Sequence, residues 1–533
     1  MKKINYVFIL IASLYLCVLL AFMCRTDARD GASVGRITLA SSMFSGDGSA
    51  KPEIWSPLYL YITARAVSLA GNIPAFFSGC GSPGDILILR LLTLFFCFLS
   101  IFPFYYLVKI IFNERAALIS AFLMAVFPFN IRWSSIPLEL NIFIFCMLSA
   151  LALFFRYKKT GNIKDLAISS LMLFFACLFR VEGWLYIPIL GAMLFARKGR
   201  DYRHIMVFAF IALAGPVIWM GIEYHFTGDC LYYLHKTSQI AARVFSLSQC
   251  SMEEKVWYWP VELYREISLP VFLLALLGVF YEIKKRKEFG LLSVAFIPVL
   301  VFMFASSVSS ISLTRRYMLL NGILILPYAG MVIEKFRRFG KIIFSALLVL
   351  FLLLASVNSY LRLKADLPRF SSSERSLIDW CGRNIGPSEM LLVETEDWDF
   401  YAVMYYCGLK GTSIAWQSPA GTLLAVFSKK TPDQEKMMRF FIKDYSPRKE
   451  LKYMESSSAR LSRLEEHVDC GNLSSAVEKY RIRYFIAPSS GSFLKGLLKG
   501  CLPGCYNFNV ELETEDYTIY GIRFPAPSGR REV

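Results

Sequence analysis

Long apolar segments alternate with short charged ones along the first 360 residues. Eleven of these segments have roughly the 20-residue length that an α-helix needs to cross the hydrocarbon core of a bilayer. They are 4–23, 85–108, 116–132, 137–155, 165–180, 183–197, 205–225, 267–283, 289–309, 317–335 and 341–360. The pattern predicts a polytopic α-helical membrane protein of about eleven spans, whose first helix is retained rather than cleaved as a signal peptide.

The charged loops between these segments predict an orientation. Basic clusters recur after every second segment, which places them all on one side of the membrane, and the positive-inside rule makes that side cytoplasmic. They are Lys2–Lys3, 109–115, 156–164, 196–204, 282–288 and 334–341. We therefore expect an integral protein of the plasma or inner membrane with a cytoplasmic N-terminus. The first loop, 25–84, and the region from 361 onward then face outward.

Composition and charge agree with this assignment. The chain has 533 residues, 56% of them hydrophobic, and a formal net charge of +17. Of the 58 Lys+Arg and 41 Asp+Glu residues, 24 and 22 lie in 361–533, so the positive excess belongs to the first 360 residues. Because that excess gathers in the cytoplasmic loops, it reflects membrane topology and predicts no nucleic-acid partner.

The outward segments predict further structure. In the first loop, "VGRITLASSMF" and "WSPLYLYITARAVSLAG" indicate two juxtamembrane helices lying at the interface. Beyond 361, one amphipathic helix, "SSERSLIDWCGRN", is followed by short apolar stretches typical of strands: "MLLVET", "TSIAWQ", "RYFIAPS" and "DYTIYGIRF". We expect two domains, a transmembrane domain over 1–360 and an extracytoplasmic mixed α/β domain over 361–533.

Four carboxylates on the predicted outer face are candidates for chemistry: Asp27 and Asp30 after the first segment, Glu139 and Glu182 in later outer turns. Ionisable residues at membrane depth are costly and point to function. A carboxylate can also take a proton from a nucleophile. A structural alternative stays open for Asp30, which precedes a predicted helix and could be its N-cap.

Arginines lie on the same predicted face. They are Arg180 in "FRVEGW" and the pair Arg315-Arg316 in "SLTRRYM". A guanidinium group binds phosphate through two parallel hydrogen bonds, which suits an anionic lipid substrate. An ion pair between Arg180 and Glu182, and interfacial anchoring by Arg315-Arg316, are the structural alternatives.

The order of these motifs resembles the GT-C superfamily of membrane glycosyltransferases. This superfamily includes protein O-mannosyltransferases, the aminoarabinose transferases of lipid A and catalytic subunits of oligosaccharyltransferases. The resemblance covers about residues 1–335. It rests on "RDGASVGRITLASSMFSGD", "KPEIWSPLYLYI", "RLLTLFF", "FRVEGWLYIPIL", "YHFTGDCLYYL" and "RRYMLLNGILILP" in that order.

The resemblance implies an inverting transfer of a sugar from a polyprenyl- or dolichyl-phosphate donor to a protein, lipid or glycan acceptor on the outer face. Asp30, Asp27 and Glu139 are then the catalytic residues. Many members carry two adjacent acids, whereas Gly31 follows Asp30 here, so the register between Asp27 and Asp30 stays open.

The remaining implied roles concern the donor phosphate, the sugar and a metal. Arg315, Arg316 and Arg180 would bind the donor phosphate, and Glu182, Tyr59, Trp55 and His235 would contact the sugar or the acceptor. A divalent cation, Mg²⁺ or Mn²⁺, stays open as a cofactor because some members use one and others none. Two other functions are alternatives: a polysaccharide polymerase or ligase, and a transporter or flippase of lipid-linked sugars.

Overall fold

The chain divides into two compact units, which are treated separately below. A computed structural model describes residues 2–27, 36–37, 56–70, 84–196, 202–244, 251–285, 289–307, 315–336, 341–365, 370–386, 390–395, 403–404, 410–411, 416–417, 423–428, 482–488 and 507–523. The first unit comprises 1–26 and 39–367, and the second 27–38 and 368–533. The predicted domain boundary after residue 360 falls inside a helix that ends at Ala365.

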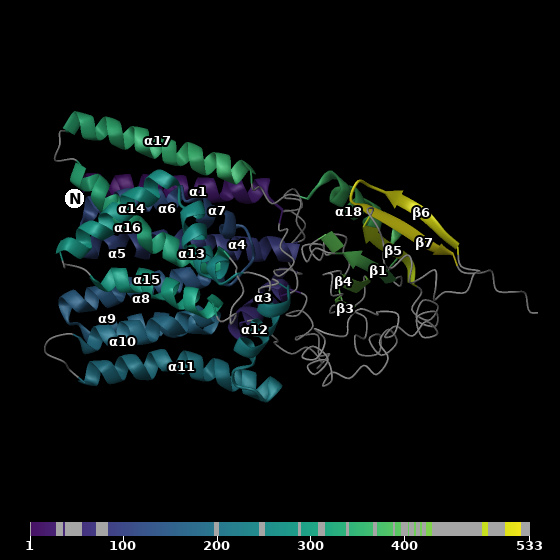
Figure 1. Ribbon diagram of the computed structural model, residues 1–533, viewed down its shortest axis with the longest axis horizontal. Coiled ribbons are helices and arrows are strands. Elements are labelled where there is room, and N and C mark those ends of the chain that lie inside the picture. Colours follow the sequence, from purple (N-terminus) through teal and green to yellow (C-terminus); the bar gives the residue numbers. More distant parts are fainter. Residues whose placement is uncertain are drawn as a thin grey trace, which may run out of the picture. The chain divides into compact units, whose positions relative to one another are not determined.

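The first unit is built from helices, most of which lie side by side with similar axis directions (Figure 1). They are α1 (Lys2–Arg25), α3 (Pro57–Ala70), α4 (Gly84–Leu99), α5 (Ile101–Ile111), α6 (Glu114–Ala125), α7 (Pro128–Ser134), α8 (Leu140–Thr160), α9 (Ile163–Phe179), η2 (Val181–Leu185), α10 (Tyr186–Phe195), α11 (Tyr202–Thr227), α12 (Tyr232–Val244), α13 (Met252–Glu266), α14 (Leu269–Lys285), α15 (Phe289–Ser307), η3 (Arg315–Met318), α16 (Leu319–Phe336) and α17 (Lys341–Ala365). The two η elements are single 3₁₀ turns.

Each of the eleven predicted apolar segments coincides with one helix or with two consecutive ones. Within the described residues, six helices are long and apolar enough to cross a membrane, or up to eight if two bent pairs each count as one span. The protein is therefore an integral membrane protein, and the number eleven stays a prediction. The bends are 56° between α6 and α7 and 114° between α13 and α14, so α13 does not continue the direction of α14.

Close helix packing depends on small residues. A Cβ atom added to Gly330 of α16 would lie 2.9 Å from the carbonyl oxygen of Ala116 on α6. One added to Gly278 of α14 would lie 2.5 Å from the carbonyl oxygen of Tyr328. Since apolar lipid gives helices no hydrophobic reason to associate, such close approach is what holds neighbouring spans together. Gly330 and Gly278 thus join α6, α16 and α14 into one layer of the bundle.

The second unit contains one helix and a mixed sheet. α18 (Ser372–Asn384) begins with a capping box, in which Ser371 and Glu374 each accept the other's backbone N–H. The strands are β1 (Met390–Thr395), β2 (Lys410–Gly411), β3 (Trp416–Gln417), β4 (Leu423–Ser428), β5 (Ile482–Pro488), β6 (Asn507–Glu513) and β7 (Tyr517–Arg523). Their order is β2-β4-β1-β5-β7-β6, with β3 beside β4; β1 and β5 are parallel, and the other pairs are antiparallel.

The sequence located much of this sheet. The segments predicted at 390–395, 483–489 and 516–524 coincide with β1, β5 and β7, and the predicted amphipathic helix is α18. Leu377 and Cys381 of α18 pack against Leu391 and Ile486 in a small core. The predicted strand at 412–417 contains β3, whereas β2, β4 and β6 were not predicted.

Candidate active site

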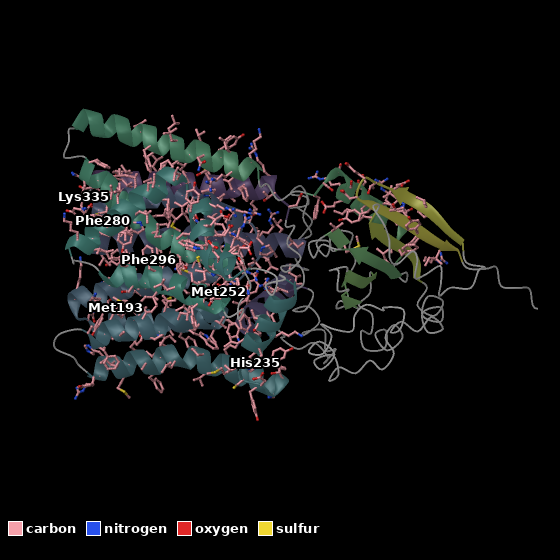
Figure 2. The ribbon with its side chains drawn as sticks, in the orientation of Figure 1. Met193, His235, Met252, Phe280, Phe296 and Lys335 are labelled. Carbon is pink, nitrogen blue, oxygen red and sulfur yellow. The ribbon has the colours of Figure 1, made fainter. Side chains whose placement is uncertain are left out.

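A small pocket opens in the first unit between α8, η2, α15 and η3. Its lining is mostly apolar and aromatic, with three charged side chains and one amide: Leu140, Phe143, Arg180, Glu182, Tyr186, Phe302, Arg316, Tyr317, Leu320 and Asn321. Figure 2 places Lys335 and Met193 at one end of the bundle and Met252 and His235 at the other. Because Arg316 precedes α16 and Lys335 is near its last residue, the pocket lies toward the end opposite Lys335.

Arg180 is the centre of the pocket's ionic network. Its Nε donates to Glu182 Oε1 at 2.9 Å, its Nη1 donates to Glu139 Oε1 at 2.8 Å, and its Nη2 also reaches Glu182. The side chain of Arg180 is only 4% exposed, and those of the two glutamates are 7% and 9% exposed. All three guanidinium nitrogens therefore serve buried ion pairs, which satisfy a charge that would otherwise be costly at this depth.

The backbone explains why Arg180 and Glu182 meet. α9 ends at Phe179, Arg180 is extended with φ −151° and ψ 137°, and η2 begins at Val181. A Cβ atom at Gly183 would lie 3.1 Å from the Cys177 backbone, so glycine lets this turn fold back on the last turn of α9. The Arg180–Glu182 ion pair, which the sequence analysis gave as a structural alternative, is present.

Arg315 and Arg316 have different surroundings, although they are consecutive. Arg316 lines the pocket, and its Nε is buried without a hydrogen-bond partner within the described part of the chain. Arg315 instead pairs with α13, with its Nε 3.0 Å from Glu262 Oε2 and its Nη1 3.6 Å from Glu266 Oε1. The geometry thus favours Arg316 over Arg315 as the residue that meets a ligand.

Aromatic side chains form another wall of the pocket. The guanidinium carbon of Arg180 lies 5.5 Å from the centre of the Tyr317 ring, a cation–π arrangement. Tyr317 in turn stacks on Phe302 with ring centres 5.7 Å apart. Tyr233 of α12 interacts electrostatically with the charged and aromatic side chains Tyr317, Glu182, Arg180 and Arg316. Burial raises the pKa of Tyr233 well above the usual value. Its hydroxyl therefore stays protonated and able to donate.

Two unsatisfied polar atoms lie at this pocket. Glu182 Oε2 and Arg316 Nε are both buried and make no hydrogen bond within the residues that the structure describes. Buried polar atoms normally have partners, so a ligand that offers the opposite groups would pair with this acceptor and this donor. A hydroxyl group would satisfy the carboxylate, and an oxyanion would satisfy the guanidinium group.

Of the two candidate acids of the first loop, Asp27 lies within the described residues and Asp30 does not. Asp30 and Trp55 fall outside the described residues. Asp27 belongs to the second unit, where its Oδ2 accepts from the backbone N–H of Phe370 at 3.0 Å and lies 3.4 Å from Arg375 Nη2. The Asp27 carboxylate thus binds the start of α18, where a negative charge also complements the helix dipole.

Arg90 was not among the predicted site residues, yet it fixes the end of α1. Its Nη2 donates to the carbonyl oxygens of Met23 and Thr26 at 2.8 and 2.9 Å, and its Nε donates to Ser135 O at 3.0 Å. Arg90 is 1% exposed, and cationic donors suit the unpaired carbonyls of a helix C-terminus. An ionisable residue inside the apolar segment 85–108 was the sequence signal that could have revealed it.

Tyr59 and His235 lie away from the pocket lining. Tyr59 lies on α3, and its side chain is 1% exposed in the protein core. Its backbone N–H donates to Ser56 Oγ at 3.2 Å. His235 is exposed on α12, with its Nδ1 2.7 Å from Asp229 Oδ2. The hydrogen bonds from His235 and from the Leu231 backbone lower the pKa of Asp229. The roles predicted for Tyr59 and His235 in binding sugar or acceptor stay predictions.

A metal site is not assembled in the described part of the chain, where no group of three or more His, Cys, Asp or Glu side chains has a suitable arrangement. Asp229 and His235 pair with each other. A divalent cation as cofactor stays a prediction.

Comparisons with known proteins agree with this architecture. Residues 83–219, which include Glu139, Arg180 and Glu182, match the family model "Dolichyl-phosphate-mannose-protein mannosyltransferase". A structure of ArnT from Cupriavidus metallidurans bound to undecaprenyl phosphate is similar with a TM-score of 0.57 and 12% identity, over 96% of this chain and 97% of that one. The chain therefore shares the fold of ArnT, and its residues 83–219 are similar to the mannosyltransferase family. The resemblance inferred from the sequence is thereby confirmed.

The apo oligosaccharyltransferase of Archaeoglobus fulgidus is similar with a TM-score of 0.49 and 13% identity, over 91% of this chain and 69% of that one. No match is found among the curated proteins. At 12% identity the ArnT structure indicates a shared fold and no more.

Proposed function

We propose that this protein transfers a sugar from a polyprenyl- or dolichyl-phosphate donor to a protein, lipid or glycan acceptor on the extracytoplasmic face of the membrane. The observation that carries the proposal is the pair of unsatisfied atoms at the pocket, Glu182 Oε2 and Arg316 Nε. A glycosyl phosphodiester offers both of the missing partners, a sugar hydroxyl and a phosphate oxyanion. The undecaprenyl phosphate bound to the similar ArnT structure is a lipid of the same class.

Arg316 is the arginine of the pocket that has no carboxylate partner within the described residues. Arg180 is paired with both Glu139 and Glu182, which leaves that network one negative charge, and the charge of Arg316 balances it. We assign the lipid phosphate to Arg316, with Arg180 as the residue that holds the two glutamates in place. Arg315, engaged by Glu262, is a less suitable ligand for the phosphate.

The reaction is a single displacement at the anomeric carbon. The acceptor's hydroxyl or amide attacks C1, the bond between C1 and the phosphate oxygen breaks, and the configuration inverts. Arg316 stabilises the negative charge that develops on the leaving lipid phosphate. Asp30, which lies outside the described residues, is proposed as the base that takes the acceptor proton.

The test is to supply the purified full-length protein with radiolabelled polyprenyl-phosphate sugars and a cell-envelope extract as the source of acceptor, and to measure release of free polyprenyl phosphate. We expect one donor to be consumed by the wild type and not by R316A. If no such donor is consumed or bound, the proposed function is wrong.

A further inference from the structure

Glu262 is a buried carboxylate of α13 that lies outside the pocket lining. Its side chain is 2% exposed, and its two oxygens face different arginines. Oε1 accepts from Arg265 Nη1 at 2.7 Å, and Oε2 lies 3.0 Å from Arg315 Nε. Because a buried charge is stable only when it is paired, these ion pairs stabilise Glu262, and the one with Arg315 links η3 to α13.

The same face of α13 contacts η3 a second time. Trp259 precedes Glu262 by three residues and therefore lies on the same side of the helix. Its ring centre is 6.2 Å from that of Tyr317, and its Nε1 donates to Ser306 Oγ at 2.8 Å. α13 thus binds the residues on both sides of Arg316, Arg315 by an ion pair and Tyr317 by ring packing.

Successive residues of a 3₁₀ turn point in different directions. With three residues per turn, neighbouring side chains project about 120° apart, so Arg315 and Arg316 cannot face the same point together. The arginine that pairs with α13 therefore determines which of the two faces the pocket.

We propose that Glu262 is a positioning residue of the donor site, which binds Arg315 and so presents Arg316 to the lipid phosphate. This inference rests on the proposed function and adds to it a residue that touches no substrate. Loss of the Glu262 charge leaves Arg315 with only its longer ion pair to Glu266, at 3.6 Å, so η3 is held less tightly against α13. Donor affinity then falls because Arg316 is held in place less firmly.

The experiment measures binding of undecaprenyl phosphate to the purified full-length protein in detergent. E262Q, R316A and the double variant E262Q/R316A are compared with the wild type, and E253Q serves as the control because Glu253 is exposed on the first turn of the same helix. We expect E262Q to weaken binding about tenfold, which lies within the usual range of coupling between neighbouring residues. E253Q should bind like the wild type, and R316A should bind more weakly than E262Q.

The double variant separates positioning from a general structural effect. If Glu262 acts through Arg316, E262Q/R316A binds no more weakly than R316A alone. Wild-type affinity in E262Q, or independent effects that multiply in the double variant, would overturn the inference while leaving the proposed function intact. A wild type that does not bind the lipid, or an R316A variant that binds it normally, would overturn the proposed function itself.

Discussion

At the residue scale, neighbouring side chains of the same type have separate tasks. Arg316 lines the pocket, whereas Arg315 is bound to α13. Among the first-loop acids, the Asp27 carboxylate accepts from Phe370 at the start of α18. A carboxylate already engaged in this way is less available as a base. This favours Asp30 over Asp27 as the proposed catalytic base.

We predict that D30N abolishes sugar transfer while the protein is produced and inserted normally. The reason is that an amide of the same size cannot take the acceptor proton. D27N should be milder, since its amide oxygen can still accept from the Phe370 N–H. Transfer is measured with the labelled donor identified above, and full activity in D30N would contradict the catalytic assignment.

The Arg180 network gives a prediction about stability. R180M leaves Glu139 and Glu182 buried without their shared cation, which costs about 3–5 kcal/mol for a buried pair broken on one side. A clearly lower melting temperature in detergent is therefore expected.

K109M is the matched control for R180M, because the Lys109–Glu114 pair is partly exposed and such pairs contribute only about 0–1 kcal/mol. If R180M melted no lower than K109M, the Arg180 pairs would not stabilise the fold. Both variants are compared with the wild type in the same detergent.

At the scale of elements, the ends of helices carry the site. Arg180 and Glu139 flank the ends of α9 and α8, and Arg316 lies in the turn before α16. Arg90 fixes the last carbonyls of α1. Such positions suit function because helix ends combine a rigid frame with unpaired backbone groups. The helices must also pack closely enough to bring these ends together.

Gly330 tests the importance of that packing. G330V would place side-chain atoms against Ser120 and the Ala116 carbonyl of α6, since even a Cβ atom lies too close to both. We expect separation of α6 from α16, a lower melting temperature and reduced yield. G221A is the control, because a Cβ atom at Gly221 of α11 meets nothing within 4 Å. Equal melting of the two variants would show that this contact is unimportant.

At the scale of the whole molecule, the helical unit has two distinguishable ends. Figure 2 shows Lys335 and Met193 at one end, and His235 and Met252 at the other. The basic loops predicted to be cytoplasmic adjoin the first of these ends, whereas the pocket lies toward the second. The positive-inside rule therefore predicts a pocket that opens on the outer side.

Reporter fusions test this orientation. A phosphatase reporter, active only outside the cytoplasm, should be active when fused after residue 367 and inactive when fused after residue 287. The reason is that Lys284 and Lys285 end α14 within a basic cluster, while 368–533 is nearly neutral. The opposite result would reverse both the topology and the face on which transfer is proposed.

The sequence by itself determined the helical membrane class, the positions of the apolar segments and much of the α18, β1, β5 and β7 pattern. It did so because hydrophobic length and periodicity are local properties. It also named Glu139, Arg180, Glu182 and Arg316. Only the tertiary structure decided that these four meet, that Arg315 turns toward Glu262, and that Asp27 contacts α18. Those facts depend on which residues distant in the chain become neighbours, and no local pattern encodes that. The role of Glu262 likewise became visible only through its partners, whereas the position of Arg90 inside an apolar segment was a local signal.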